Sequence, residues 1–150
     1  MDDAADGSGT LAGVAWALRR AELAVQGAKE QQLRSLGMAP AHFSLMMCVR
    51  ARPGLTGAEA ARQLHVTPQA VASLVARLEG RGQLERRTHP RHRHVQELHL
   101  TEAGHEVLVA ATRIVAEIER RIIDRLGADA TVQLKGLLND VTDATDRPQG

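Results

Sequence analysis

Two arginines alternate with other residues in a short basic loop, His89-Pro90-Arg91-His92-Arg93. A guanidinium group stays charged and donates several hydrogen bonds in one plane, so it binds phosphate oxygens and enters the negative, narrow minor groove of A·T-rich duplexes. The spacing therefore indicates that Arg91 and Arg93 bind in or beside a minor groove. A merely solvated basic loop is the alternative.

A second group of candidate DNA-contacting residues lies upstream, on one side of a helix that is expected to follow Thr67. Glutamine can pair with adenine, and arginine with guanine or phosphate. A helix that presents small and polar residues suits insertion into a major groove, although a solvated helix face would look the same. With one arginine added from the following strand, the candidates are Thr67, Gln69, Ala70, Ser73, Arg77 and Arg87.

The charge of the chain is unevenly distributed, although its 150 residues carry a net charge of only +1. Residues 50–101 hold nine Lys/Arg against four Asp/Glu, a net charge of +5. The segments before and after it carry −1 and −3. A polarised basic segment is the electrostatic footprint expected of a DNA-binding module, because each arginine near a phosphate releases condensed counterions.

Capping residues mark the helix boundaries inside this basic segment. Thr56-Gly-Ala-Glu59 fits a capping box and predicts a helix over about 57–64. After a turn at His65-Val66, Thr67-Pro68 begins a helix that runs to about Gly80, since threonine caps helices and proline is tolerated at the first helical position. The two helices predict a helix–turn–helix whose second helix enters the major groove.

The flanking segments predict a mainly α fold with one small antiparallel β-hairpin. Leu84–Thr88 and His94–Leu100 alternate partially and flank the basic loop, as the strands of a hairpin would. Phe43, Met46, Met47 and Val49 are expected to face inward from a helix that starts at Pro40. Apolar residues at three- and four-residue steps predict the other helices, over about 10–36, 102–126 and 129–143.

Together these features resemble the MarR family of winged-helix regulators over about residues 10–143. The most specific parts are LEGRGQLERR and LTEAG, on either side of the loop with alternating arginines. The resemblance implies a winged helix–turn–helix lobe over 37–101 and dimerisation helices over 10–36 and 102–146. These would form a single intertwined domain after a disordered tail, 1–9.

The resemblance also implies a homodimeric, sequence-specific transcriptional regulator. It would act as a repressor that a small ligand releases from its operator. The apolar stripes of the terminal helices independently favour a dimer, since they are long for a monomer whose only aromatic residues are Trp16 and Phe43. A two-fold dimer predicts a pseudo-palindromic operator in double-stranded DNA with half-sites roughly 10 bp apart. A winged-helix module that binds proteins without recognising a duplex is an alternative.

One position of the wing loop departs from the family pattern. Family members commonly have an acidic residue at the start of this loop, where the chain has His89. Both arginines are retained, so the resemblance implies the same DNA contacts but does not imply how the loop is braced.

A ligand pocket is implied between the dimerisation helices and the DNA-binding lobe, where family members often bind small aromatic acids. An arginine beside an aromatic ring can receive the carboxylate and ring of such a ligand. In the alternative interpretation Trp16 packs in the dimer core and the arginines are solvated. The candidate residues are Trp16, Arg19, Arg20, His42, Phe43 and Met46.

Histidines and the one cysteine suggest further chemistry. Five of the seven histidines lie between His65 and His99, and imidazoles at such spacing can bind zinc or nickel, which keeps a metal-responsive regulator as another hypothesis. No cysteine or clustered carboxylate joins them, so no metal site is expected. Cys48 is expected to be an inert packing residue that forms no internal disulfide.

Enzymatic and membrane functions lack their sequence signals. We find no phosphate-binding glycine loop, HExxH or GxSxG motif, so neither an enzyme nor a cofactor is expected. No apolar run approaches the roughly 18 residues that a membrane span needs, and the opening MDDAADGSG is unlike a signal peptide. A cytoplasmic protein without a membrane partner is therefore expected.

Overall fold

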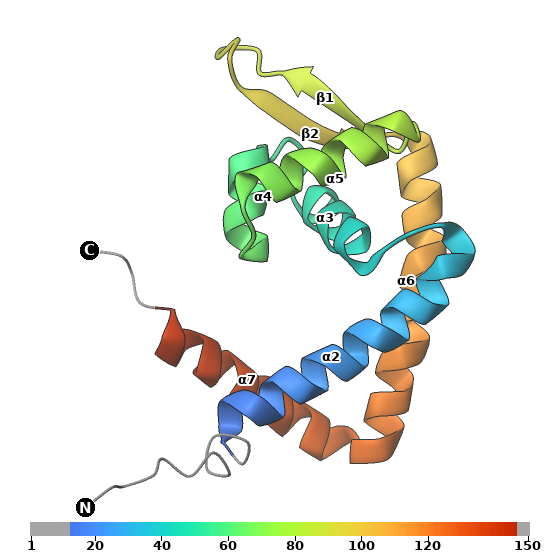
Figure 1. The fold of residues 1–150 in the computed structure, drawn as a ribbon, viewed down its shortest axis with the longest axis vertical. Coiled ribbons are helices and arrows are strands. Elements are labelled where there is room, and N and C mark those ends of the chain that lie inside the picture. Colours follow the sequence, from blue (N-terminus) through green and yellow to red (C-terminus); the bar gives the residue numbers. More distant parts are fainter. Residues whose placement is uncertain (1–12, 147–150) are drawn as a thin grey trace, which may run out of the picture. The chain divides into compact units, whose positions relative to one another are not determined.

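The computed structural model describes residues 13–146 (Figure 1). The tail expected over 1–9 and the helix start expected at Thr10 lie outside these residues. The elements in chain order are α2 (Val14–Leu33), the 3-10 turn η1 (Arg34–Leu36), α3 (Pro40–Ala51), α4 (Gly57–Leu64), α5 (Pro68–Gly80), β1 (Leu84–Thr88), β2 (Gln96–Leu100), α6 (Glu102–Leu126) and α7 (Ala128–Thr145). The predicted mainly α fold with one antiparallel hairpin is confirmed.

Helices α4 and α5 form the predicted helix–turn–helix, and the predicted caps set their boundaries. The Thr56 hydroxyl accepts a hydrogen bond from the Glu59 N–H at 3.2 Å, and the Glu59 carboxylate accepts one from the Thr56 N–H at 2.8 Å. The Thr67 hydroxyl accepts from the Ala70 N–H at 3.1 Å, directly before Pro68 begins α5. Each cap satisfies amides that have no partner within the helix, so both helices start where the sequence indicates.

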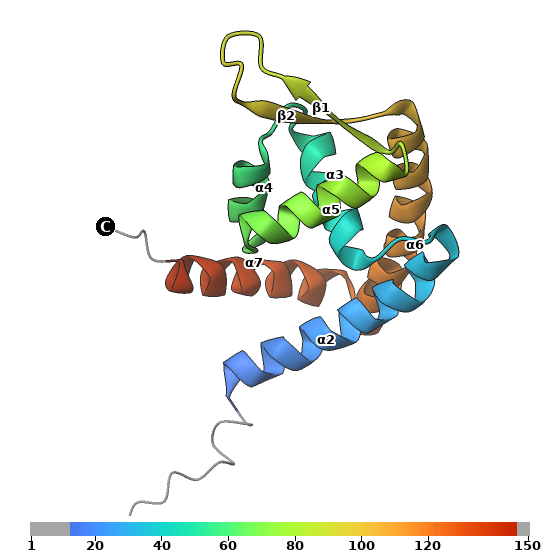
Figure 2. The same cartoon turned by 45° about the horizontal axis from the view of Figure 1, so that its top comes forward.

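The hairpin pairs β1 with β2 in an antiparallel register that places Leu84 opposite Leu100, and it projects beyond α4 and α5 in Figure 2. A third segment flanks β2 on its other side: the Gly54 N–H donates to the Leu98 carbonyl, and the Leu98 N–H donates to the Leu55 carbonyl, both at 2.9 Å. The base of the hairpin is therefore hydrogen-bonded along both edges of β2.

The predicted start of the second strand at His94 is wrong, because β2 begins at Gln96. The Val95 N–H donates to the carbonyl of His92 at 2.9 Å, and this bond closes a turn that keeps His94 and Val95 out of the strand. Alternation of polar and apolar residues in the sequence fits both a turn at His94-Val95 and a strand that includes these two residues, so it does not distinguish the two.

The core of the winged-helix lobe lies between α3, α4, α5 and the hairpin. Phe43, Met46 and Val49 are buried as predicted, whereas Met47 is only partly buried. Because nearly every position of α3 is apolar, the spacing of its apolar residues does not distinguish the buried side of the helix from the exposed side. Leu33 of α2 and Leu108 of α6 are also fully buried. The largest fully buried side chains of the described residues are Leu33, Leu45, Met46, Val49, Leu55, Val71, Leu78 and Leu108.

The chain forms two compact units, one ending at Ile114 and one beginning at Val115, within α6. The second unit consists of the rest of α6 and of α7, whose apolar side chains are largely exposed, including Val132 at 72% and Leu137 at 54%. None of the helices within residues 13–146 is long and apolar enough to cross a membrane.

The start of α6 lies directly against the base of the hairpin. The Thr101 hydroxyl accepts from the Gly104 N–H at 3.0 Å, and the Thr101 N–H donates to the Gln83 carbonyl at 3.2 Å. A Cβ atom at position 104 would lie 1.9 Å from the Gln83 carbonyl oxygen. Only glycine fits there without a backbone shift.

We predict that Gly104→Ala lowers the free energy of unfolding by about 2–3 kcal/mol, because backbone rather than a flexible side chain must move to admit the new methyl group. Gly80→Ala is the matched control, since no atom lies within 4 Å of a Cβ built at Gly80. Urea unfolding of both variants at one fixed protein concentration measures the difference. Equal stability of the two variants would contradict this account of Gly104.

His42 is the one buried polar side chain within the described residues, with 7% of its surface exposed. Its Nδ1 accepts a hydrogen bond from the Ala39 N–H at 3.3 Å at the start of α3. Burial, and then the positive charges of Arg81 and Arg77, hold the pKa of His42 below its usual value. The folded state therefore favours the neutral form of the His42 imidazole.

The lowered pKa predicts an acid-sensitive step in stability. An unfolded His42 takes up a proton near pH 6.5, whereas the folded one resists it, so its contribution is present above that pH and lost as the pH falls toward the folded pKa. We expect His42→Gln, which keeps an acceptor for the Ala39 amide, to lose less stability between pH 8 and pH 5 than the wild type. Thermal melts across this range provide the test, and parallel curves would exclude His42 as the responsible group.

Candidate nucleic-acid interface

The five residues predicted to read DNA from α5 are all exposed. Helix α5 buries Val71, Val75 and Leu78 on one side, and Leu74 is half-buried, which leaves most of the other side to solvent. Its N-terminal turn is fixed by the Thr67 cap, so the side chains of that turn start from a rigid backbone. The exposed predicted residues are Thr67, Gln69, Ala70, Ser73 and Arg77.

The two arginines at the end of α5 differ in their contacts. Arg81 donates a hydrogen bond to the Gly37 carbonyl, which ties the end of α5 to the segment between α2 and α3. Arg77 is exposed, and none of the ion pairs found within residues 13–146 includes it. Its guanidinium is thus available for a phosphate or a base edge.

The wing loop is braced by a histidine side chain. Nδ1 of His89 accepts hydrogen bonds from the backbone N–H groups of Arg91 at 3.1 Å and His92 at 3.2 Å. The His89 and His92 rings stack with their centroids 5.0 Å apart. An aspartate or asparagine at the start of a turn caps the following amides in the same way. His89 therefore caps the start of the loop, at the position where the resemblance implied an acidic residue.

The other ring nitrogen of His89 faces an acidic residue at the base of the wing. His89 Nε2 lies 3.6 Å from Glu97 Oε1, and His99 Nε2 lies 3.1 Å from Glu97 Oε2. Because Nδ1 of His89 must be unprotonated to accept two amide hydrogens, the neutral ring carries its proton on Nε2, toward Glu97. Sequence reasoning missed Glu97 and His99. Their alternate spacing places Glu97 and His99 on one strand face, but only the register of the hairpin brings Glu97 near His89.

The wing loop leaves Arg91 and Arg93 exposed, and no ion pair within the described residues engages either of them. Arg87, also predicted to bind DNA, instead forms an ion pair with Glu85 two residues away on β1. The charge of Arg87 is therefore partly offset, and the positive potential of the wing is concentrated at its tip.

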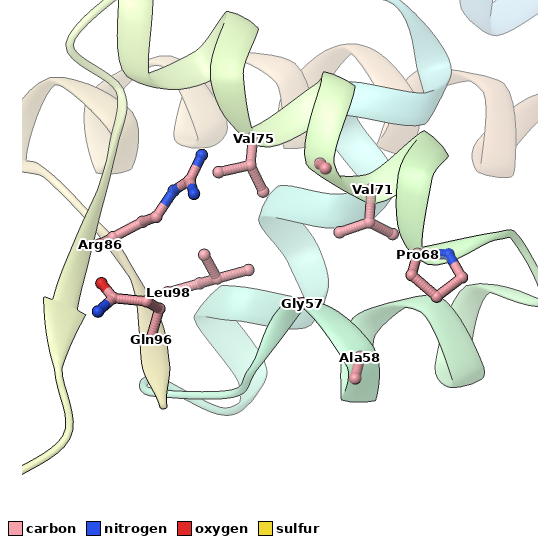
Figure 3. A pocket seen from close by; sticks show the side chains of 9 residues that line it. Gly57, Ala58, Pro68, Val71, Val75, Arg86, Gln96 and Leu98 are labelled. Atoms are coloured by element: carbon pink, nitrogen blue, oxygen red, sulfur yellow. The ribbon is translucent and has the colours of Figure 1, made fainter. Parts of the chain in front are cut away.

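A link between the wing and α5 comes from Arg86, which forms an ion pair with Glu79 near the end of α5. Figure 3 shows Arg86 on the wing side of a cavity and Val71 and Val75 of α5 on the other side. This cavity has a volume of roughly 200 Å³, and most of the surface that lines it is apolar. The two candidate DNA-contacting elements thus adjoin each other within one lobe.

The predicted ligand-binding residues are not gathered in one place. Trp16, Arg19 and Arg20 are exposed on α2, whereas His42, Phe43 and Met46 are buried in α3. A second cavity lies between α2, α3 and α5, and none of these six residues lines it. Within residues 13–146, no group of three His, Cys, Asp or Glu side chains has the arrangement of a metal site. Cys48 is buried, and burial raises the pKa of its thiol.

Comparison with known proteins agrees with this geometry. The MarR family model matches residues 36–93. The transcriptional repressor CouR, solved with a 23-mer DNA duplex, shares 30% sequence identity with this chain. The two structures superimpose with a TM-score of 0.82, and the match covers 87% of this chain and 92% of CouR. CouR bound to p-coumaroyl-CoA superimposes with a TM-score of 0.77 over 90% of this chain and 94% of CouR.

A more distant structure, MarR from E. coli, shares the fold at 21% identity, with a TM-score of 0.76 over 86% of this chain and 96% of that one. No curated protein sequence matches significantly. The capped helix–turn–helix, the braced wing and the match to CouR over nearly its whole length lead to one assignment. The chain belongs to the MarR family of winged-helix transcriptional regulators.

Proposed function

We propose that two copies of this chain form a dimer that binds a pseudo-palindromic operator and represses transcription until a small ligand releases it. The observation that carries the proposal is the hydrogen-bonded wing loop that leaves Arg91 and Arg93 exposed, next to a recognition helix with an exposed polar face. This arrangement suits simultaneous contact with a major groove and its flanking minor groove.

The proposed DNA contacts divide into two kinds. Gln69 and Ser73, near the N-terminal end of α5, would read base edges, and Arg77 would bind a base or a phosphate. Arg91 and Arg93 would bind in the minor groove, where the potential of a narrow A·T-rich stretch favours cations. Arg87 contributes less, because Glu85 already pairs with it.

The proposed dimer rests on exposed apolar surface. In α7, Leu134, Leu137 and Leu138 recur at three- and four-residue steps and are 39–54% exposed. In α2, Val14 is 69% exposed and Leu23 is 49% exposed. Stripes of this kind on separate helices are commonly buried by a partner subunit. We therefore assign 10–36 and 102–146 to dimerisation and 37–101 to DNA binding, in one intertwined domain.

Repression and release by a ligand are the finer part of the proposal. CouR, a repressor, has been solved both with DNA and with p-coumaroyl-CoA, and it is 30% identical to this chain. A regulator of the same fold with a cavity between its helices can respond to a ligand that binds its two conformations unequally.

Replacing both wing arginines tests the DNA proposal. We expect Arg91→Ala with Arg93→Ala to weaken operator binding at least about tenfold and to lower the slope of log K against log salt by about two phosphate contacts. Fluorescence anisotropy across a salt series measures both quantities. An unchanged slope would refute the wing assignment.

The matched control for the wing variant is Arg120→Ala with Arg121→Ala, which removes the same charge from α6 outside the basic segment. For this control, the slope of log K against log salt should differ from that of the wild type by no more than about half a phosphate contact.

A charge placed on the apolar stripe of α7 tests the dimer. We expect Leu137→Glu to scatter light as a monomer of half the wild-type mass, because a carboxylate buried without a partner opposes association. Asn139→Glu adds the same charge on the polar side of α7 and should remain dimeric. A dimeric Leu137→Glu protein, or a wild-type monomer, would contradict the assignment of α7.

A further inference from the structure

The loop at the tip of the wing is held by one side-chain acceptor atom. Two backbone bonds close the loop, from the His89 N–H to the Val95 carbonyl and from the Val95 N–H to the His92 carbonyl, both at 2.9 Å. Inside it, the N–H groups of Arg91 and His92 both donate to Nδ1 of His89. Within residues 13–146, no other side chain forms a hydrogen bond with the backbone of the loop 89–95. The backbone that carries Arg91 therefore depends on one imidazole nitrogen.

This acceptor is lost when the ring of His89 takes up a proton. A neutral imidazole has one N–H and one bare nitrogen, and it becomes a cation when the bare nitrogen is protonated. In His89 the bare nitrogen is Nδ1, because Nδ1 accepts both amide hydrogens. The added proton therefore goes to Nδ1, where it would face two other donors. Proton uptake by His89 and the two hydrogen bonds to the loop exclude each other.

The ionisable groups that face His89 come from β2 and from the loop itself. Glu97 Oε1 lies 3.6 Å from His89 Nε2, and Glu97 Oε2 lies 3.1 Å from His99 Nε2. The His92 ring stacks on the His89 ring with the centroids 5.0 Å apart. Within the described residues, no helix contributes an ion pair to any of these four side chains. The other ionisable side chains of the hairpin are Glu85, Arg86, Arg87, Arg91, Arg93 and His94.

These neighbours act on a cationic His89 ring in opposite directions. Glu97 attracts the cation at Nε2, so the ring can charge without leaving the wing. A protonated His92 repels it, so acid also opposes the stack of the two rings. Neither neighbour offers a substitute acceptor to the two loop amides.

We propose that the wing contains an acid-sensitive switch, in which protonation of His89 at Nδ1 releases the loop that carries Arg91 and Arg93. Imidazoles in general change charge between roughly pH 5 and pH 8. At the upper end of this range the ring is neutral and holds the loop, and as the pH falls the two amides lose their acceptor. An aspartate at position 89 would stay an acceptor, because free aspartate titrates near about pH 4.

The consequence for DNA binding rests on the proposed function. A released loop must be ordered again when its arginines enter a minor groove, and this ordering lowers operator affinity. Protonated histidines also add positive charge to the wing, which raises its affinity for any DNA. The two effects have opposite signs. The test must therefore keep the added charge and remove only the titrating brace.

His89→Asn is the variant that meets this requirement. An asparagine oxygen at the start of a turn accepts the same amides and does not titrate, while the other wing histidines remain. The matched control is His94→Asn, which removes an exposed imidazole from the same loop. His94 takes no part in the brace.

Nuclear magnetic resonance of the free full-length protein measures the release directly. Between about pH 7.5 and about pH 5.5, we expect the wild-type ring signals of His89 to report protonation. Over the same range the backbone order parameters of Arg91 and His92 should fall from about 0.85 to below about 0.6. Both amides should stay ordered in His89→Asn, whereas His94→Asn should behave like the wild type.

The Ala70 amide is the internal reference for this experiment. The Thr67 hydroxyl that holds it does not titrate in this range, so its order parameter should not change with pH. A constant value excludes general unfolding as the cause, including any loss of stability that arises at His42.

Fluorescence anisotropy adds the functional measurement, with the duplex that the protein enriches from a random pool as the probe. Between about pH 7.5 and about pH 5.5, we expect the ratio of wild-type affinity to His89→Asn affinity to fall at least about fivefold, since two hydrogen bonds are lost in the wild type alone. The same ratio for wild type and His94→Asn should change by less than about twofold.

The switch is refuted if the His89 ring stays neutral at about pH 5.5, if the two amides stay ordered after the ring is protonated, or if His89→Asn loses order as the wild type does. The two measurements separate the two proposals. Loop release in a protein that enriches no duplex refutes the regulator and leaves the switch intact. Specific duplex binding with a loop that stays ordered in acid refutes the switch alone, and loop release with a constant affinity ratio refutes its effect on DNA binding.

Discussion

The geometry of the whole DNA-binding lobe depends on the backbone of Gln83. Its N–H donates to the Leu78 carbonyl at the end of α5, and its carbonyl accepts from the Thr101 N–H at the start of α6. The close approach of Gly104 to the same carbonyl leaves no room for a side chain. One residue thus joins the recognition helix, the wing and the long helix α6, so the orientation of α5 and of the wing is set from a common point.

Features encoded by neighbouring residues could be predicted from the sequence. The caps at Thr56 and Thr67 and the helices that follow them depend on contacts within four residues. Helices α4 and α5 begin and end where the sequence predicts. The hairpin was also predictable, but its second strand was placed two residues too early, because the turn that ends at Val95 is closed by a backbone bond that no residue pattern marks.

Contacts between distant segments could not be predicted. The contact of His89 with Glu97 needs the strand register of the hairpin, which no local pattern gives. Gln26 and Glu30 of α2 line a cavity with residues of α3 and α5, which the pattern of a single helix does not predict, although Glu30 stays exposed. The six residues that the family resemblance implied for a ligand pocket are divided between the exposed surface of α2 and the core side of α3.

Selection of bound sequences from a pool of random duplexes tests the central claim, that a dimer of this chain reads duplex DNA, most directly. The account predicts one enriched inverted repeat with half-site centres roughly 10 bp apart, bound by two chains per duplex. Enrichment of no sequence, or of an unsymmetrical site that binds a single chain, would contradict it.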